Sequence, residues 1–167
     1  MKMQQTCCFT GHRPQNLPWG FNESDPRCIA LKVRLKKAIR QVIEYGVTHF
    51  ITGMALGVDQ WAAELVLELQ RMYADCGITL EAVLPCEDQA KKWRREDIER
   101  YQKILKRCDI VLPLQKSYSP GCMDRRNRYM VDHSQFVIAV WDGQPSGTGG
   151  TVRYAKSLGK TVIVLAP

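Results

Sequence analysis

The sequence has no hydrophobic run long enough to cross a membrane. Its longest apolar stretches cover residues 136–141 and 162–166, far below the roughly 18 residues that a transmembrane helix needs. The N-terminus has one lysine and then polar residues, where a signal peptide would continue with an apolar segment. We therefore expect no membrane partner and a cytoplasmic location.

The sequence also lacks the cysteine spacings that bind metals or define a disulfide framework. It has seven cysteines, an odd number, with no CxxC pair and no Cys/His cluster at zinc spacing. We expect these cysteines to be buried, reduced thiols, and we expect no metal site. Repeats, low-complexity stretches and linkers are absent as well, so the 167 residues predict a single domain.

What the sequence does have is a regular alternation of two kinds of segment. Short apolar or β-branched segments alternate with longer amphipathic ones, and apolar residues make up 45% of the chain. This pattern predicts a Rossmann-like, doubly wound α/β fold with a mostly parallel six-stranded sheet and helices on both faces. Strands are expected at 6–10, 48–52, 80–84, 110–112, 136–141 and 161–165, and helices at 26–45, 58–75, 90–107, 123–132 and 150–158.

Ligands of such sheets bind beyond the carboxyl ends of the strands, so the loops after the strands are the place to search for function. The first loop is long, about 14 residues against the usual 2 to 6. In it, Arg13 could pair with a phosphate and His12 could donate to a phosphate or ribose oxygen. Trp19 or Phe21 could cover a base, or the aromatic residues could fold back onto the body of the protein.

The loop after the second strand starts with Gly53 and leads through Gly57 into a helix. Glycines here allow a tight turn and a close approach of the backbone to a ligand, and the first helical turn offers free N–H groups to a phosphate. Asp59 suits the helix dipole, but it could equally accept a hydrogen bond from a ribose hydroxyl. Trp61 lies on the buried stripe of the helix and is expected in the core.

Two further segments follow the fourth and fifth strands. Segment 147–151 (GTGGT) holds three glycines and two threonines in front of a helix, which favours a backbone cradle for an anion over a merely flexible loop. It matches neither the P-loop nor the GxGxxG pattern. Arginines open the short helix at 123–132, where Arg126 or Asn127 could face the ligand or lie on a solvated basic surface.

Together, these segments resemble the SLOG superfamily, and most closely its YpsA-like branch. The resemblance rests on 8–14 (CFTGHRP), 53–59 (GMALGVD), Pro85-x3-Gln89-x3-Trp93, Arg126-Asn127-x2-Met130-Val131-Asp132 and 147–151 (GTGGT), and thus covers nearly the whole chain. It implies a Rossmann-like protein that binds a nucleotide or a nucleotide-derived ligand. The superfamily includes the DprA DNA-processing proteins and the lonely-guy phosphoribohydrolases, and its ligand loops fall on 10–13, 53–59 and 147–151.

One position departs from the phosphoribohydrolase pattern, PGGxGTxxE. Tyr154 stands where that pattern has its glutamate, and a tyrosine with a pKa near 10 does not replace a carboxylate that stabilises an oxocarbenium-like charge. Lonely-guy catalysis is therefore not the expected activity. If the chain is an enzyme acting on nucleotide N-glycosidic bonds, Asp59 and Glu64 are the catalytic candidates.

The sequence thus predicts a protein that binds a nucleotide, an ADP-ribose-like molecule or a dinucleotide, with no certain cofactor. A sensor or regulatory protein is the role that such binding suggests. The alternatives are an N-glycosidic-bond hydrolase or transferase and a DprA-like single-stranded DNA binder. The DNA alternative rests on the net charge of +7 and on segment 91–107, which has eight basic and three acidic residues. The sequence does not decide whether the protein forms a homo-oligomer. The expected ligand-binding residues are Thr10, Gly11, His12, Arg13, Gly53, Met54, Gly57, Asp59, Arg126, Asn127, Asp142, Gly147, Thr148, Gly149, Gly150 and Thr151.

Overall fold

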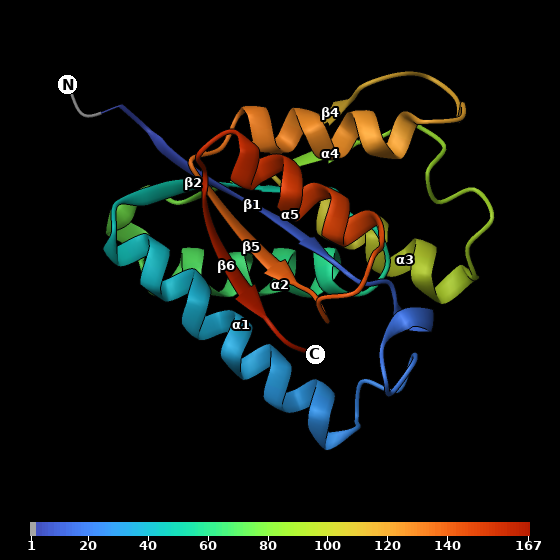
Figure 1. The fold of residues 1–167 in the computed structure, drawn as a ribbon, viewed down its shortest axis with the longest axis horizontal. Helices are drawn as coiled ribbons and strands as arrows, with labels where there is room; N and C mark the ends of the chain where they lie inside the picture. The colour runs from blue at the N-terminus through green and yellow to red at the C-terminus, as the bar shows by residue number, and fades with distance from the viewer. Residues whose placement is uncertain (1–2) are drawn as a thin grey trace.

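The computed structural model describes residues 3–167 and has a single parallel sheet of six strands in the order β4-β3-β2-β1-β5-β6 (Figure 1). The predicted Rossmann-like α/β fold is confirmed, and the sheet is parallel throughout. The strands are β1 (Gln5–Gly11), β2 (Val47–Thr52), β3 (Thr79–Leu84), β4 (Ile110–Pro113), β5 (Phe136–Val140) and β6 (Thr161–Leu165). The helices are α1 (Pro26–Glu44), α2 (Val58–Met72), α3 (Arg95–Leu105), α4 (Cys122–Asp132) and α5 (Gly147–Ser157), with short 3-10 turns η1 (Pro14–Asn16) and η2 (Ala74–Cys76).

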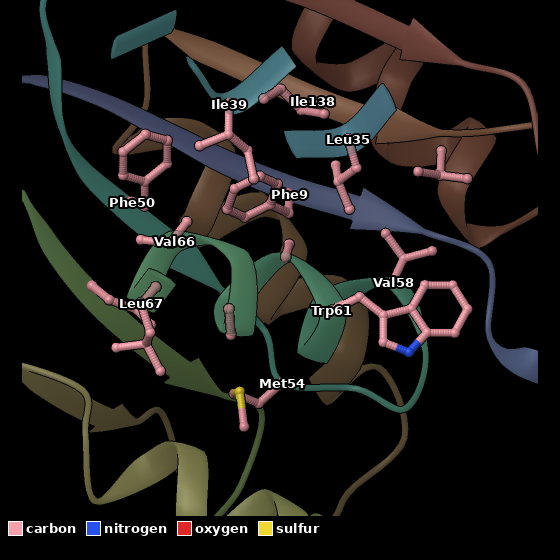
Figure 2. Packing of buried hydrophobic residues seen from close by; sticks show 14 of the residues in the cluster. Phe9, Leu35, Ile39, Phe50, Met54, Val58, Trp61, Val66, Leu67 and Ile138 are labelled. Atoms are coloured by element: carbon pink, nitrogen blue, oxygen red, sulfur yellow. The ribbon is translucent and has the colours of Figure 1, made fainter. Parts of the chain in front are cut away.

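Helices cover both faces of the sheet because its central strands are apolar on both sides. In β1, Cys7 and Phe9 point into a large core under α1, α2 and α3, whereas Cys8 points into a smaller core under α4 and α5. Phe9 stacks on Phe50 of β2 with ring centroids 5.9 Å apart. Figure 2 shows these rings between the α1 and α2 side chains, and Trp61 lies in the same core, as predicted.

Local sequence signals fix the ends of several helices. Asp25 caps α1 by accepting a hydrogen bond from the Arg27 backbone N–H at 2.9 Å, and Pro26 occupies the first helical position. Gly46 ends the same helix with a positive φ of 102°, a conformation that favours glycine. These are the residues from which the sequence predicts this helix, and its observed bounds differ from the prediction by one residue.

Two helices begin three or more residues away from the expected position. Helix α3 begins at Arg95 instead of position 90, because residues 88–93 form turns that place the buried Gln89 against the loop after β2. Helix α5 begins at Gly147 instead of position 150, because Ser146 caps it through a 3.1 Å bond from the Gly149 N–H. The glycine-rich segment 147–151 is therefore the first part of a helix and not a loop, and the binding of an anion there stays a prediction.

Other expectations hold in part. All seven cysteines are free thiols, but Cys76 is exposed and Cys108 half-buried, so the expectation that all are buried is wrong for these two. Trp19 folds into the core, whereas Phe21 is exposed and lies beneath the Arg94 guanidinium. Between residues 3 and 167, no helix combines the length and apolar character needed to cross a bilayer.

Candidate ligand-binding site

The strand order reverses between β1 and β5, and a cleft of about 510 Å³ lies beyond the carboxyl ends of these strands. Open α/β sheets bind ligands at such a switch point because the loops of the two strands leave toward opposite faces and leave a gap between them. The cleft is lined by the end of β1 and η1, the loop before α2, the first turns of α4 and the start of α5. It is therefore formed by segments far apart in the sequence.

The N-terminus of α5 forms one wall of the cleft. Ser146 uses its side chain to accept from Gly149 and its carbonyl to accept from the Gly150 N–H at 2.9 Å. The N–H groups of Gly147 and Thr148 precede the first N–H that donates within the helix, so they have no partner in the helical hydrogen-bond pattern. Both residues line the cleft. This end of the helix also carries the positive pole of the helix dipole. The wall is therefore suited to an anion.

Arg126 of α4 lies in the opposite part of the cleft with only 3% of its surface exposed. Its Nη1 donates to the Gly53 carbonyl at 2.5 Å, and its Nε donates to Asn127 Oδ1 at 2.9 Å. Gln89 also donates to the Gly53 carbonyl, at 3.2 Å. A Cβ atom on Gly53 would lie 2.6 Å from the Arg126 guanidinium carbon, so this glycine makes room for the arginine. Arg126 is thus fixed and not a mobile surface cation.

Asp59 is a buried carboxylate at the floor of the cleft. Its Oδ2 accepts a hydrogen bond from the Ala55 N–H at 3.2 Å. Burial raises the pKa of Asp59 above its ordinary value, while the positive charges of Arg126 and Arg13 and the Ala55 N–H partly offset that rise. Two hydrogen bonds tie the loop before α2 to the first turn of that helix, which carries Asp59: Thr52 Oγ1 donates to the Asp59 carbonyl and accepts from the Met54 N–H. Met54 has a positive φ of 58°, so its role is to shape this loop.

His12 and Asp142 join the ends of β1 and β5 at the rim of the cleft. The Asp142 N–H donates to His12 Nε2 at 3.3 Å, and Asp142 Oδ1 lies 3.2 Å from the same nitrogen. A hydrogen bond from the Gln144 N–H is the main reason why the pKa of Asp142 lies below its ordinary value. The Asp142 backbone N–H therefore positions the histidine ring, and the Asp142 side chain does not line the cleft.

The structure brings nine of the sixteen predicted residues, from four distant segments, into the cleft and leaves the others outside. Those that line it are Thr10, Gly11, His12, Arg13, Asp59, Arg126, Asn127, Gly147 and Thr148. Residues behind its wall or outside it are Gly53, Met54, Gly57, Asp142, Gly149, Gly150 and Thr151. Lining residues that the sequence did not single out are Phe9, Gln15, Asn16, Ala55, Gly121, Met123, Asp124 and Ser146. Of these, Ser146 had a usable signal, since serine before a helix is a frequent N-cap.

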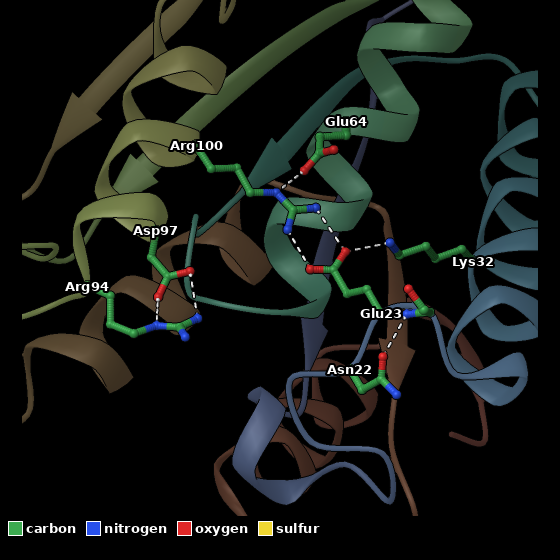
Figure 3. Close-up of polar contacts among 8 residues, drawn as sticks. Asn22, Glu23, Lys32, Glu64, Arg94, Asp97 and Arg100 are labelled. Carbon is green, nitrogen blue, oxygen red and sulfur yellow. Dashed lines mark hydrogen bonds and ion pairs between the residues drawn. The ribbon is translucent and has the colours of Figure 1, made fainter.

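Glu64 is not in the cleft, which corrects its candidacy as a catalytic residue. Its Oε1 accepts from Arg100 Nε at 2.6 Å, and Arg100 also pairs with Glu23, which pairs in turn with Lys32 (Figure 3). This network borders a different groove, about 660 Å³ in volume, between α2 and α3. It fastens the long loop after β1 to these helices. Of the two catalytic candidates, Asp59 and Glu64, Asp59 is the one that lies at the cleft.

The structure offers no cluster of metal ligands in the part it describes. Across residues 3–167, no three His, Cys, Asp or Glu side chains gather in a way that could hold a metal ion. The groups that meet at the cleft are instead arginines, the buried carboxylate of Asp59, the exposed carboxylate of Asp124, hydroxyl groups and free backbone N–H groups. The N–H, guanidinium and hydroxyl donors suit phosphate oxygens, and the carboxylates suit ribose hydroxyls.

Comparison with known proteins identifies the family. The model of the YspA SLOG family (YpsA) matches residues 7–159. The chain belongs to this family. The SLOG resemblance and its YpsA-like branch, predicted from five sequence segments, are thereby confirmed, and the matched range includes all the segments that line the cleft.

Several bacterial relatives are similar over most of the chain. The uncharacterised SPbeta prophage-derived protein YoqJ of Bacillus subtilis (strain 168) is 32% identical over 145 residues, covering 79% of this chain and 84% of YoqJ. A UPF0398 protein of Bacillus pumilus (strain SAFR-032) is 29% identical over 141 residues, covering 83% of this chain and 74% of that protein.

A solved structure of DNA processing protein A from Helicobacter pylori shares the fold. The TM-score is 0.63 at 20% identity, over 96% of this chain and 64% of the other. This chain therefore spans less than two thirds of that protein, whose structure was described for its single-stranded DNA binding mode. At this identity, the likeness establishes the common fold.

Proposed function

We propose that this SLOG protein, acting as one ligand-binding domain, binds a nucleotide or a nucleotide-derived molecule in the cleft between β1 and β5. The observation that carries the proposal is the meeting of Arg13, Arg126 and the free N–H groups of Gly147 and Thr148 around one hollow. A phosphate there would accept hydrogen bonds from the start of α5 and pair with the exposed Arg13. Because Arg126 is already held by the Gly53 carbonyl, its charge is in place before the ligand arrives.

The remaining lining groups suit the sugar of such a ligand. Asp59 accepts one backbone hydrogen bond, and a carboxylate has capacity for more, such as those from ribose hydroxyls. His12, held by Asp142, and the hydroxyl of Thr10 lie at the same edge. The volume of about 510 Å³ falls within the usual range for small-molecule sites.

The arrangement supports binding more than hydrolysis of an N-glycosidic bond. Tyr154 is turned to Asp132, to which its hydroxyl donates at 2.6 Å, and Glu64 is held by Arg100. Asp59 is left without a second carboxylate from the predicted catalytic set, and Asp124, the other carboxylate that lines the cleft, is exposed and pairs with Arg128 at 3.1 Å. Glycoside hydrolysis usually relies on a pair of carboxylates, one acid and one base or nucleophile.

The basic segment that suggested DNA binding is only partly neutralised, because three of its eight basic residues pair with carboxylates. Arg94 pairs with Asp97, Arg95 with Glu99, and Arg100 with Glu23 and Glu64. The likeness to DNA processing protein A is one of fold, and single-stranded DNA binding is therefore the second candidate. Electrostatic binding to DNA would weaken steeply with salt, which distinguishes it from a small-ligand site.

The test is equilibrium binding and thermal-shift screening of the whole chain against nucleoside monophosphates, ADP-ribose, dinucleotides and inorganic phosphate. A binder raises the melting temperature in proportion to the logarithm of its excess over Kd. The decisive variant is Gly147→Asp, because a Cβ there meets nothing within 4 Å and an acidic residue suits a helix N-terminus. We expect an unchanged fold and an affinity for phosphorylated ligands about thirtyfold lower, roughly 2 kcal/mol.

Arginine variants supply the matched control. Arg13→Ala should weaken binding, whereas Arg71→Ala, which removes an exposed arginine from the last turn of α2, should not. If no phosphorylated compound shifts the melting temperature, or if Gly147→Asp binds as tightly as the wild type, the proposal is wrong. A salt-sensitive shift of labelled oligonucleotide alone would favour the DNA candidate instead.

A further inference from the structure

A second hollow continues the cleft along the surface between α4 and α5. It has a volume of about 400 Å³ and shares two lining residues, Asp124 and Asn127, with the ligand cleft. Because these two side chains border both hollows, the hollows meet at the first turns of α4. The groove runs past Gly150 and Tyr154 to Ser157, positions that helical spacing places along one face of α5.

The glycines on this face have no evident role within the chain. Gly147 and Gly150 have no positive φ; a Cβ on Gly147 would meet nothing within 4 Å, and one on Gly150 would meet only Arg153 Nη2, at 4.0 Å. Gly149 differs, because its Cβ would come within 3.0 Å of the Trp141 ring. Glycine inside a helix is unfavourable relative to alanine. At Gly150, the missing Cβ leaves the floor of the groove open.

The groove also carries positive charge that the protein does not neutralise. Within residues 3–167, the Arg153 guanidinium takes part in no hydrogen bond or ion pair. Arg128 donates to Asp124 Oδ2 through Nε at 3.1 Å and stacks on the Tyr154 ring at 4.7 Å, which leaves its two Nη groups for another acceptor. The groove is therefore prepared for a second anionic group, away from the start of α5.

The spacing of the two anion sites sets the size of the ligand. Gly147 and Thr148 line the cleft and not the groove, whereas Arg128 and Arg153 line the groove and not the cleft. The Arg153 side chain reaches back along α5, and its Nη2 lies 4.0 Å from the Cβ position of Gly150. The proposed function places a phosphate and its nucleoside in the cleft, so a ligand that also fills the groove carries a second phosphate beyond that nucleoside.

We propose that the natural ligand class is a phosphodiester-linked dinucleotide with a terminal phosphate. The terminal phosphate lies at the start of α5, and the linking phosphate lies in the groove against Arg153 and Arg128. This inference rests on the proposed function, because it places the first phosphate in the same cleft. It adds a second site that a mononucleotide leaves empty.

The experiment compares deoxyadenosine monophosphate with the 5′-phosphorylated dinucleotide of deoxyadenosine by titration calorimetry on the full chain. We expect the dinucleotide to bind the wild type at least tenfold more tightly. Arg153→Ala should remove this advantage and leave the affinity for the mononucleotide unchanged. Lys156→Ala is the matched control, since it removes one positive charge from the same helix without lining the groove, and it should change neither affinity.

A second variant tests the open floor. Gly150→Ala should weaken dinucleotide binding and spare the mononucleotide, because its Cβ projects into the groove and not into the cleft. Equal affinities of the wild type for the two ligands, or an equal loss of both in Arg153→Ala, would overturn the inference and leave the proposed function standing. If neither ligand binds the wild type, both proposals fail together.

Discussion

Replacing Gly53 by alanine should displace Arg126 from the cleft. The three atoms nearest to a Cβ at this position all belong to the Arg126 side chain, at 2.6, 2.6 and 2.9 Å. Contacts this short require one partner to move, and the guanidinium is the movable one. It cannot move without losing its hydrogen bond to the Gly53 carbonyl, and Arg126 is only 3% exposed, so water does not replace that bond.

The magnitude follows from the bond that is lost. A hydrogen bond to a charged group contributes about 1.5–3 kcal/mol, so Gly53→Ala should lower the free energy of unfolding by about this amount. For a chain of this size, that corresponds to a fall in melting temperature of roughly 3–12 °C. Nucleotide affinity should fall as well, because the positive charge leaves its position beside Asp59.

A double-mutant cycle isolates this cause. Gly53 has no positive φ, so in an Arg126→Ala background the alanine at position 53 finds open space and should cost nothing, or even stabilise the chain by about 0.4–1 kcal/mol. Urea unfolding of the wild type, both single variants and the double variant measures the coupling. If Gly53→Ala is equally destabilising in both backgrounds, Arg126 is not the reason for the glycine and the reasoning is refuted.

Three further predictions concern the surroundings of the cleft. Gly150→Ala should raise the stability of the ligand-free protein by about 1 kcal/mol through helix propensity, and a lower urea midpoint would contradict this. Burial raises the pKa of Asp59, so the folded protein holds this proton more tightly than the unfolded chain, and ionisation lowers stability. The wild type should therefore lose stability relative to Asp59→Asn as the pH rises from about 4 through the raised pKa of Asp59. Urea unfolding of both proteins at several pH values measures this, and a difference in unfolding free energy that stays constant with pH would contradict it. Glu64→Gln should leave nucleotide affinity unchanged and lower stability by less than about 1 kcal/mol, as expected for a partly exposed ion pair; an affinity loss would return Glu64 to the site.

The segments that carry strong local signals were predictable. Helix α1 has a proline at its first position, an aspartate cap and a glycine after its end, and its bounds follow from these residues. Helix α3 has weaker signals, and the prediction started it five residues too early. Residues 90–94 have a helix-compatible composition, but the nearby Gln89 is needed to bridge to the Gly53 carbonyl, and this tertiary contact holds the segment in turns.

The sequence was enough to predict which loops form the candidate site, but not how the side chains of those loops are arranged. The rule that ligands bind at the carboxyl ends of parallel strands pointed to Arg13, Asp59 and Gly147, which do line one cleft. The same rule does not say which side chains turn inward. Gly53 is among the expected ligand-binding residues, but it lies behind the wall of the cleft and makes room for Arg126.

The alternation of apolar and amphipathic segments, together with five sequence motifs, was enough to determine the fold class and the family of this protein. Both follow from short segments taken one at a time, because each segment's own side chains set its strand or helix periodicity. Only the tertiary structure decided that Glu64 pairs with Arg100 away from the cleft, that Arg126 is buried beside Gly53, and that the groove between α4 and α5 joins the cleft. These facts depend on which distant residues the strand order β4-β3-β2-β1-β5-β6 brings together, and no spacing within one segment encodes that order.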